Sequence, residues 1–254
     1  MGQLEKKGWE IIRSNNVDQL KSLRENIYVI VKKHFDLKEN DSEIGMNLFH
    51  NHCQNLTDGD LNSKKISVIS EISNNKPLVD MIFKSFDKKI VELVGKDILV
   101  QKTINVVIQK PFDKNPTIPH RDAPPNSFFE LVIWIPLVDC QKSKSMYVLD
   151  IENTDNILKQ SEKDPNEWEK FIHNFHEKKI YPTVNFGESL FFLPCIYHGS
   201  DINKTKETRF SLNIRFKNLF SPSGKKFPLH FFRPYKISEF TKVALEKTKK
   251  EFLK

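Results

Sequence analysis

The stretch Arg209–Phe216 has the most regular pattern in the chain, RFSLNIRF. Apolar and polar side chains alternate along it without a break. Successive side chains of a β-strand point to opposite faces, so the pattern predicts a strand with one apolar face. The other face carries Arg209, Ser211, Asn213 and Arg215. It either meets solvent or lines a polar cavity. A cavity would explain why this face lacks the acids and lysines found on most other segments.

Further short strands are expected before this stretch. Residues 98–109 are rich in β-branched side chains, and residues 128–136 and 188–193 also have the composition of strands. Residues 152–178 are instead polar and charged, and they include Asn166–Ile172, whose composition is typical of a helix. The pattern therefore indicates a helical insertion between strands.

Helices are expected towards both ends of the chain. Residues 17–35 carry apolar side chains at intervals of three and four, and a second helix is expected from Asp41, whose carboxylate can cap it. One or two more are predicted over residues 64–95, with a break at Asn-Asn-Lys-Pro. Near the C-terminus, a Pro- and aromatic-rich loop at Phe227–Tyr235 precedes a helix that Ser238 can cap.

This order of elements predicts a mainly β fold with flanking helices. A double-stranded β-helix, the jelly-roll core also found in cupins, fits many short strands buttressed by helices. We expect a single domain over residues 1–254. It would comprise a helical part at 1–96, a jelly-roll core at 97–218 with the insertion at 152–178, and a loop and helix at 219–254.

Composition places the chain among soluble globular proteins. It has 254 residues, a net charge of +7 and three cysteines, Cys53, Cys140 and Cys195. The lysines are dispersed, so a solvated surface is expected, although a basic surface also attracts anions. Few, unpaired cysteines indicate a reducing compartment, and no apolar run approaches a membrane span. These features predict a cytoplasmic protein.

His120-Arg-Asp122 is the clearest candidate for site chemistry. An imidazole and a carboxylate two residues apart lie on one face of an extended chain. With His198 from a distant strand they would form a facial triad of two histidines and one carboxylate, which suits non-haem Fe(II). The alternative is a histidine and an aspartate hydrogen-bonded to each other at a turn. The pair His50 and His52 is a weaker candidate, because side chains at i and i+2 diverge on a helix.

A cavity beside Arg209 and Ser211 would suit a second ligand. Iron chemistry with O₂ requires electrons, which a 2-oxo acid supplies on decarboxylation. The distal carboxylate of 2-oxoglutarate needs a fixed planar donor with a hydroxyl nearby. Arg209 and Ser211, two residues apart on one face, provide this pair.

Taken together, these motifs resemble the Fe(II)/2-oxoglutarate dioxygenases of the phytanoyl-CoA hydroxylase type. The resemblance covers about residues 98–217 and rests on three motifs: His120-x-Asp122, His198-Gly-Ser200-x-x-Asn203-x-Thr205, and Arg209-x-Ser211 eleven residues after the second histidine. The runs at 129–139 and 144–149 are similar to a narrower group, oxygenases encoded with bacterial surface-carbohydrate and aminoglycoside-sugar genes.

The resemblance implies roles for single residues. His120, Asp122 and His198 would bind Fe(II), and Arg209 would bind the distal carboxylate of 2-oxoglutarate. Ser200, Ser211 and Gln101 are further cosubstrate candidates. Asp122 stands where related halogenases have a small residue, which favours hydroxylation or another oxidation. The substrate implied is a sugar or a sugar-containing precursor, with a nucleotide-linked or phosphorylated sugar compatible with the charge.

Two other functions fit parts of the sequence. Arg209 and Arg215, six residues apart, resemble a feature of nucleic-acid dealkylating dioxygenases, although the chain has no clear basic stripe. A non-oxidative cupin-like protein, either a sugar isomerase or a carbohydrate-binding module, is the other alternative, because a fold does not determine a function. Binding of 2-oxoglutarate would separate this last class from the oxygenases.

Overall fold

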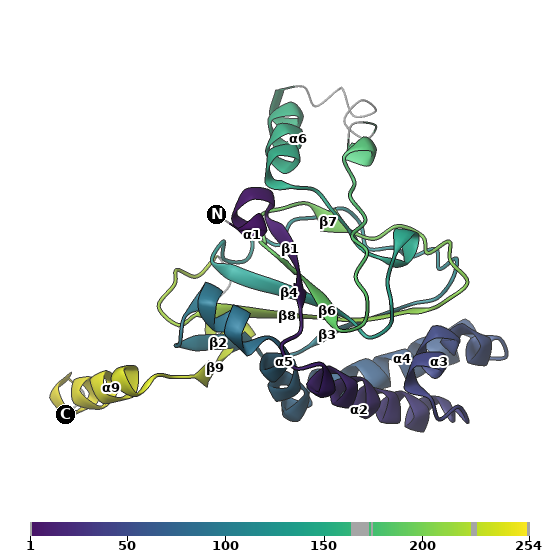
Figure 1. Ribbon diagram of the computed structural model, residues 1–254, viewed down its shortest axis with the longest axis horizontal. Helices are drawn as coiled ribbons and strands as arrows, with labels where there is room; N and C mark the ends of the chain where they lie inside the picture. Colours follow the sequence, from purple (N-terminus) through teal and green to yellow (C-terminus); the bar gives the residue numbers. More distant parts are fainter. Residues whose placement is uncertain (1, 164–172, 174, 225–227, 253–254) are drawn as a thin grey trace.

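An antiparallel sheet forms the centre of the protein (Figure 1). The computed structural model describes residues 2–163, 173, 175–224 and 228–252. Within these residues the sheet has the strand order β1-β6-β4-β8-β2-β9. The same edge of β8 pairs with β2 towards its C-terminal end and with β3 towards its N-terminal end. The strands are β1 (Trp9–Arg13), β2 (Ile98–Gln101), β3 (Asn105–Gln109), β4 (Glu130–Pro136), β6 (Glu188–Phe192), β8 (Arg209–Asn218) and β9 (Phe232–Lys236).

A second, smaller sheet completes the jelly roll. Strands β5 (Tyr147–Val148) and β7 (His198–Gly199) pair in antiparallel fashion. Isolated bridges extend this sheet on both sides, from His198 to His120 and from Val148 to Ile180. The predicted mainly β, double-stranded β-helix fold with flanking helices is therefore confirmed.

Most of the N-terminal helices lie along one side of the large sheet (Figure 1). They are α2 (Val17–Phe35), α3 (Ser42–Asn47), the 3₁₀ helix η1 (Phe49–Cys53), α4 (Asp58–Ser73) and α5 (Lys76–Val94), whereas the short helix α1 (Gln3–Lys7) lies at the far end of β1. Asp41 caps α3 by accepting hydrogen bonds from the backbone N–H groups of Glu43 and Ile44. Pro77 lies in the first turn of α5, where its missing N–H costs nothing.

The apolar face of β8 packs against these helices. Its four apolar side chains, Phe210, Leu212, Ile214 and Phe216, are fully buried. The Phe210 ring lies 5.3 Å from that of Phe49, and the Phe216 ring lies 6.1 Å from that of Phe83. The alternation therefore turns the polar face of β8 inward, and of the two possibilities the sequence left open, the cavity is the correct one.

Some elements differ from the sequence-based expectations. The segment expected to be a loop at Phe227–Tyr235 instead forms helix α8 (Pro228–Phe231) and strand β9, because its backbone pairs with β2. Strand β1 was not expected in the helical N-terminal part; it completes the sheet edge beside β6. The helix after Asp41 ends at Asn47, and Ile44 and Leu48 are 48% and 41% exposed.

The remaining helices lie at the periphery. They are α6 (Ile151–Lys163), the 3₁₀ turn η2 (Lys142–Lys144) and α9 (Glu239–Phe252). The expected helix at Asn166–Ile172 lies outside the described residues. Ser238 caps α9 as predicted, and this helix extends away from the body (Figure 1) with Phe240, Val243 and Leu245 exposed. No helix in the described ranges has the length and apolar character needed to cross a membrane.

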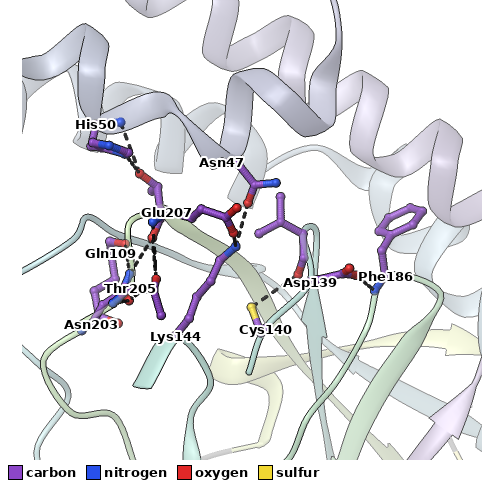
Figure 2. Close-up of polar contacts among 12 residues, drawn as sticks. Asn47, His50, Gln109, Asp139, Cys140, Lys144, Phe186, Asn203, Thr205 and Glu207 are labelled. Carbon is purple, nitrogen blue, oxygen red and sulfur yellow. Dashed lines mark hydrogen bonds and ion pairs between the residues drawn. The ribbon is translucent and has the colours of Figure 1, made fainter. Parts of the chain in front are cut away.

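A buried lysine joins the helical part to the segment before β8, as Figure 2 shows. Lys144 Nζ donates to Asn47 Oδ1 at 2.7 Å and to Glu207 Oε2 at 2.6 Å. The lysine side chain is 2% exposed and the glutamate 50%. The backbone N–H of Thr208 also donates to the Asn47 carbonyl. Helix α3 therefore fixes the chain immediately before Arg209.

The burial difference predicts an asymmetric response to mutation. Glu207→Ala leaves a buried ammonium ion with Asn47 as its remaining side-chain partner, and should lower the free energy of unfolding by about 2 kcal/mol. Lys144→Met removes the charge that is costly to bury and leaves a glutamate that water can solvate, so the loss should stay within about 1 kcal/mol. Urea unfolding of both variants measures the difference. A larger loss for Lys144→Met than for Glu207→Ala would contradict this explanation.

Candidate active site

Three candidate metal ligands meet at the edge of the smaller sheet. One ligand atom from each of His120, Asp122 and His198 lies within 4.8 Å of the others. The two histidines face each other across the antiparallel bridge, in which each backbone N–H donates to the other's carbonyl at 3.0 Å. The structure thus brings together residues that are 78 positions apart in the sequence (198 − 120).

Both imidazole rings are oriented in the same way. His120 Nδ1 donates to the Ile118 carbonyl at 2.8 Å, and His198 Nδ1 donates to the Ile196 carbonyl at 3.1 Å. A carbonyl can only accept, so the proton is on Nδ1 and the lone pair is on Nε2. Burial also lowers the pKa of His198 to about 4, which keeps its ring neutral at physiological pH. Both features suit metal ligation.

Asp122 supplies the negative charge of the group. Burial alone would raise the pKa of its carboxyl, but Arg215 and His198 outweigh this effect and hold the pKa below its ordinary value. Arg215 Nη2 lies 2.7 Å from Oδ1. The other oxygen, Oδ2, is buried without a hydrogen bond and lies 3.7 Å from His198 Nε2.

The donor set fits a divalent metal ion. A buried carboxylate oxygen without a hydrogen bond is costly unless a cation or donor satisfies it. Two imidazole nitrogens and that oxygen lie close together, and two histidines with one carboxylate are the ligand set associated with non-haem Fe(II). The pair His50 and His52 does not join this group, since His50 Nδ1 instead contacts the Thr208 hydroxyl.

A cavity of about 170 Å³ is lined by both histidines of the triad and by Arg209. Arg209 is 3% exposed, and its Nε and Nη1 are buried without a hydrogen-bond partner. No carboxylate among the described residues forms an ion pair with it. Burial lowers the pKa of the guanidinium to about 10, which leaves the group charged. The cavity therefore holds a fixed, unpaired positive charge that can bind an anion.

The other predicted cosubstrate residues occupy different positions. Ser200 lines the cavity, and its Oγ accepts a hydrogen bond from the Thr117 backbone at 2.9 Å. Ser211 is fully buried on the same face of β8 as Arg209, with an Oγ that has no partner. Gln101 is not among the cavity-lining residues; its amide contacts Asn105 at 3.3 Å and Arg215 at 3.4 Å.

Several cavity residues were not predicted as site residues. Trp134 lies in the segment at 128–136 that was expected to be a strand, whereas Asn213 was recognised on the polar face of residues 209–216 without a role. Both line the cavity, together with Asn105, Val107, Thr117 and Met146. Strand alternation carries the signal for Asn213, but nothing in the sequence marks Thr117 or Met146, which reach the cavity from loops. Phe128, by contrast, lines a separate surface groove.

Several solved structures share this fold, and three of them are described as non-heme enzymes or contain 2-oxoglutarate. The carbocyclase SnoK from nogalamycin biosynthesis, described as non-heme and alpha-ketoglutarate dependent, has a TM-score of 0.56 at 12% identity, with 92% of each chain covered. EctD from S. alaskensis, solved with 2-oxoglutarate and 5-hydroxyectoine, has a TM-score of 0.51 at 12% identity, covering 92% of this chain and 83% of EctD. The non-heme monooxygenase ThoJ in complex with nickel has a TM-score of 0.50 at 13% identity, with coverages of 97% and 93%.

At 12–13% identity these likenesses show a shared fold, the double-stranded β-helix with flanking helices. No protein-family model matches the chain, and no curated protein matches it in sequence.

Proposed function

We propose that this protein is an Fe(II)- and 2-oxoglutarate-dependent dioxygenase that oxidises a C–H bond of a small molecule. The observation that carries the proposal is Arg209. A buried guanidinium with unpaired donors, in the cavity that both histidines of the triad also line, calls for an anionic ligand next to the metal. A plain metal-binding or sugar-binding protein of this fold has no need for that charge.

Different residues would bind the metal and the cosubstrate. His120, Asp122 and His198 would hold Fe(II), which when bound supplies the O₂ chemistry, with decarboxylation of 2-oxoglutarate to succinate providing two electrons. Arg209 would bind the distal carboxylate of the cosubstrate. Ser211 Oγ, buried two residues further along the same face, would donate to that carboxylate. Ser200 and Gln101 remain weaker candidates, because both already have protein partners.

For the substrate, we propose a sugar or sugar-containing precursor in carbohydrate biosynthesis. This part rests on the resemblance of residues 129–139 and 144–149 to oxygenases encoded with bacterial sugar genes. The broader resemblance to the phytanoyl-CoA hydroxylase type rests on the motifs at His120, His198 and Arg209. The net charge of +7 is compatible with a nucleotide-linked or phosphorylated sugar. We also propose that residues 1–254 act as one domain in the cytoplasm.

The test is an anaerobic titration of the wild-type protein with Fe(II) and 2-oxoglutarate. Chelation of the metal by the 2-oxo acid should give a weak visible charge-transfer band that saturates at one equivalent of iron. Succinate should then accumulate when O₂ is admitted. Protein that binds Fe(II) but shows no band at saturating 2-oxoglutarate would contradict the proposal and favour a non-oxidative cupin-like protein.

A further inference from the structure

The two oxygens of Asp122 have different surroundings. Oδ1 receives a charge-assisted hydrogen bond from Arg215 Nη2 at 2.7 Å, whereas Oδ2 is buried without one and faces His198. Charge-assisted bonds of this length are among the stronger hydrogen bonds in proteins. The hydrogen bond therefore fixes the orientation of the Asp122 carboxylate, with Oδ2 on the side of the two imidazoles.

Arg215 itself is held by two further strands. It is 7% exposed on β8, and its Nη1 donates to Gln101 Oε1 on β2 at 3.4 Å. Its Nε lies 3.7 Å from Glu130 Oε2 on β4, and the other oxygen of Glu130 accepts from the Ser127 backbone at 3.0 Å. The contact with Glu130 is an ion pair without a hydrogen bond, so the guanidinium is oriented by its bonds to Asp122 and Gln101 and by the nearby charge on β4.

The two arginines of the polar face therefore differ in kind. Arg209 is buried without an acidic partner, whereas Arg215 lies between two carboxylates, those of Asp122 and Glu130. Their spacing of six residues on one strand face does not give them one role. Arg209 is available to an anion in the cavity, and the charge of Arg215 is already balanced by the protein.

We propose that Arg215 is a positioning residue for the metal site: it occupies Asp122 Oδ1, so that Oδ2 alone is presented to the metal, and Gln101 and Glu130 hold the guanidinium in place. This inference deepens the proposed function, since it rests on the triad being a metal site. It also assigns Gln101 to the support of Arg215 instead of to the cosubstrate. Loss of such outer hydrogen-bond partners typically costs 10–100-fold in metal affinity.

The direction in which metal affinity changes distinguishes a positioning role of Arg215 from a purely electrostatic one. Arg215 is a cation close to a site for a divalent cation, so by electrostatics alone its removal would tighten metal binding. Positioning predicts the opposite. In Arg215→Met, Co(II) should bind about 10–100-fold more weakly than in the wild type, with altered visible absorption of the bound ion. In Arg215→Lys, the charge remains but the planar donor does not, so affinity should again fall.

A matched control is available on the same strand. Lys217 is a buried cation two residues from Arg215, opposite Glu130, and its Nζ donates to the Ser221 and Pro222 carbonyls instead of to Asp122. Lys217→Met removes a comparable buried charge from β8 and should leave Co(II) affinity within about threefold of the wild type.

Titration of the ligand-free proteins with Co(II), without 2-oxoglutarate, decides the matter. Weaker binding in both Arg215 variants but not in Lys217→Met supports the positioning role. Unchanged or tighter binding in Arg215→Met, or equal losses in Arg215→Met and Lys217→Met, overturns it while leaving the proposed function intact. A wild-type protein that binds no Co(II) overturns both. Arg215→Lys keeps the test valid if the methionine variant fails to fold.

Discussion

Substitution of His198 by alanine should abolish metal binding. His198 contributes an Nε2 lone pair whose orientation is set by the Nδ1 hydrogen bond to Ile196 and by packing against the Phe192 ring, with ring centroids 4.8 Å apart. In this variant only His120 and Asp122 remain as protein ligands, and two ligands hold a metal ion more weakly than three. Loss of a residue that only hydrogen-bonds a ligand lowers metal affinity by up to roughly 100-fold, and loss of the ligand itself should lower it further. Titration with Co(II), monitored by visible absorption, gives the affinity.

The control for this variant is another histidine outside the site. His52 is exposed on the 3₁₀ helix η1 and is not part of the metal-binding group. His52→Ala should bind Co(II) as the wild type does. Thermal unfolding of His198→Ala checks that the fold persists. Disruption of the smaller sheet by the substitution would also weaken metal binding, even if His198 were not a ligand. A folded His198→Ala protein with wild-type affinity would remove the triad from consideration.

The sequence predicted the structure best where the alternation of side chains along a strand is kept in the folded protein. The alternation of Arg209–Phe216 survives folding because β8 is paired on both edges, by β4 on one side and by β3 and β2 on the other. Its register therefore fixes which side chains enter the core. The fold class followed from this pattern and from the helices at each end.

The pairing of distant segments was not readable in the same way. Strands β1 and β9 are defined by the partners they find, β6 and β2, and their own sequences carry weak signals. An aromatic, Pro-containing segment such as Phe232–Lys236 has the composition of a loop, but its backbone pairs at the edge of the sheet, where proline is tolerated.

The candidate site shows the same division. The spacing of His120 and Asp122 suggested that both side chains share one face, and the structure does bring them together with His198. The surroundings of Arg215 were not predictable, because they depend on contacts with β2 and β4 that are set by the tertiary fold. Sequence alternation placed Arg209 and Arg215 on one face. Only the folded arrangement separates an unpaired arginine from a paired one.

Arg209→Met should therefore separate ligand binding from stability. Methionine fills a similar volume but cannot bind a carboxylate, and loss of one partner of a buried charged pair costs about 3 kcal/mol. The affinity for 2-oxoglutarate should fall by roughly 100-fold, since 1.4 kcal/mol corresponds to a factor of ten. Co(II) affinity should not fall, because Arg209 contacts none of the three metal ligands in the described structure. Anaerobic titration of the Fe(II) protein measures the first quantity.

The same substitution should make the ligand-free protein more stable. Folding buries the Arg209 charge without an acidic partner, and this desolvation is unfavourable until an anion arrives. Methionine removes that cost, so urea unfolding without 2-oxoglutarate should shift to higher denaturant concentration. Saturating 2-oxoglutarate should stabilise the wild type but not the variant. Arg209→Lys keeps one charged donor and should lie between the two in affinity. If Arg209→Met instead destabilised the ligand-free protein and bound 2-oxoglutarate normally, Arg209 would be a structural cation and the anion would have to bind elsewhere.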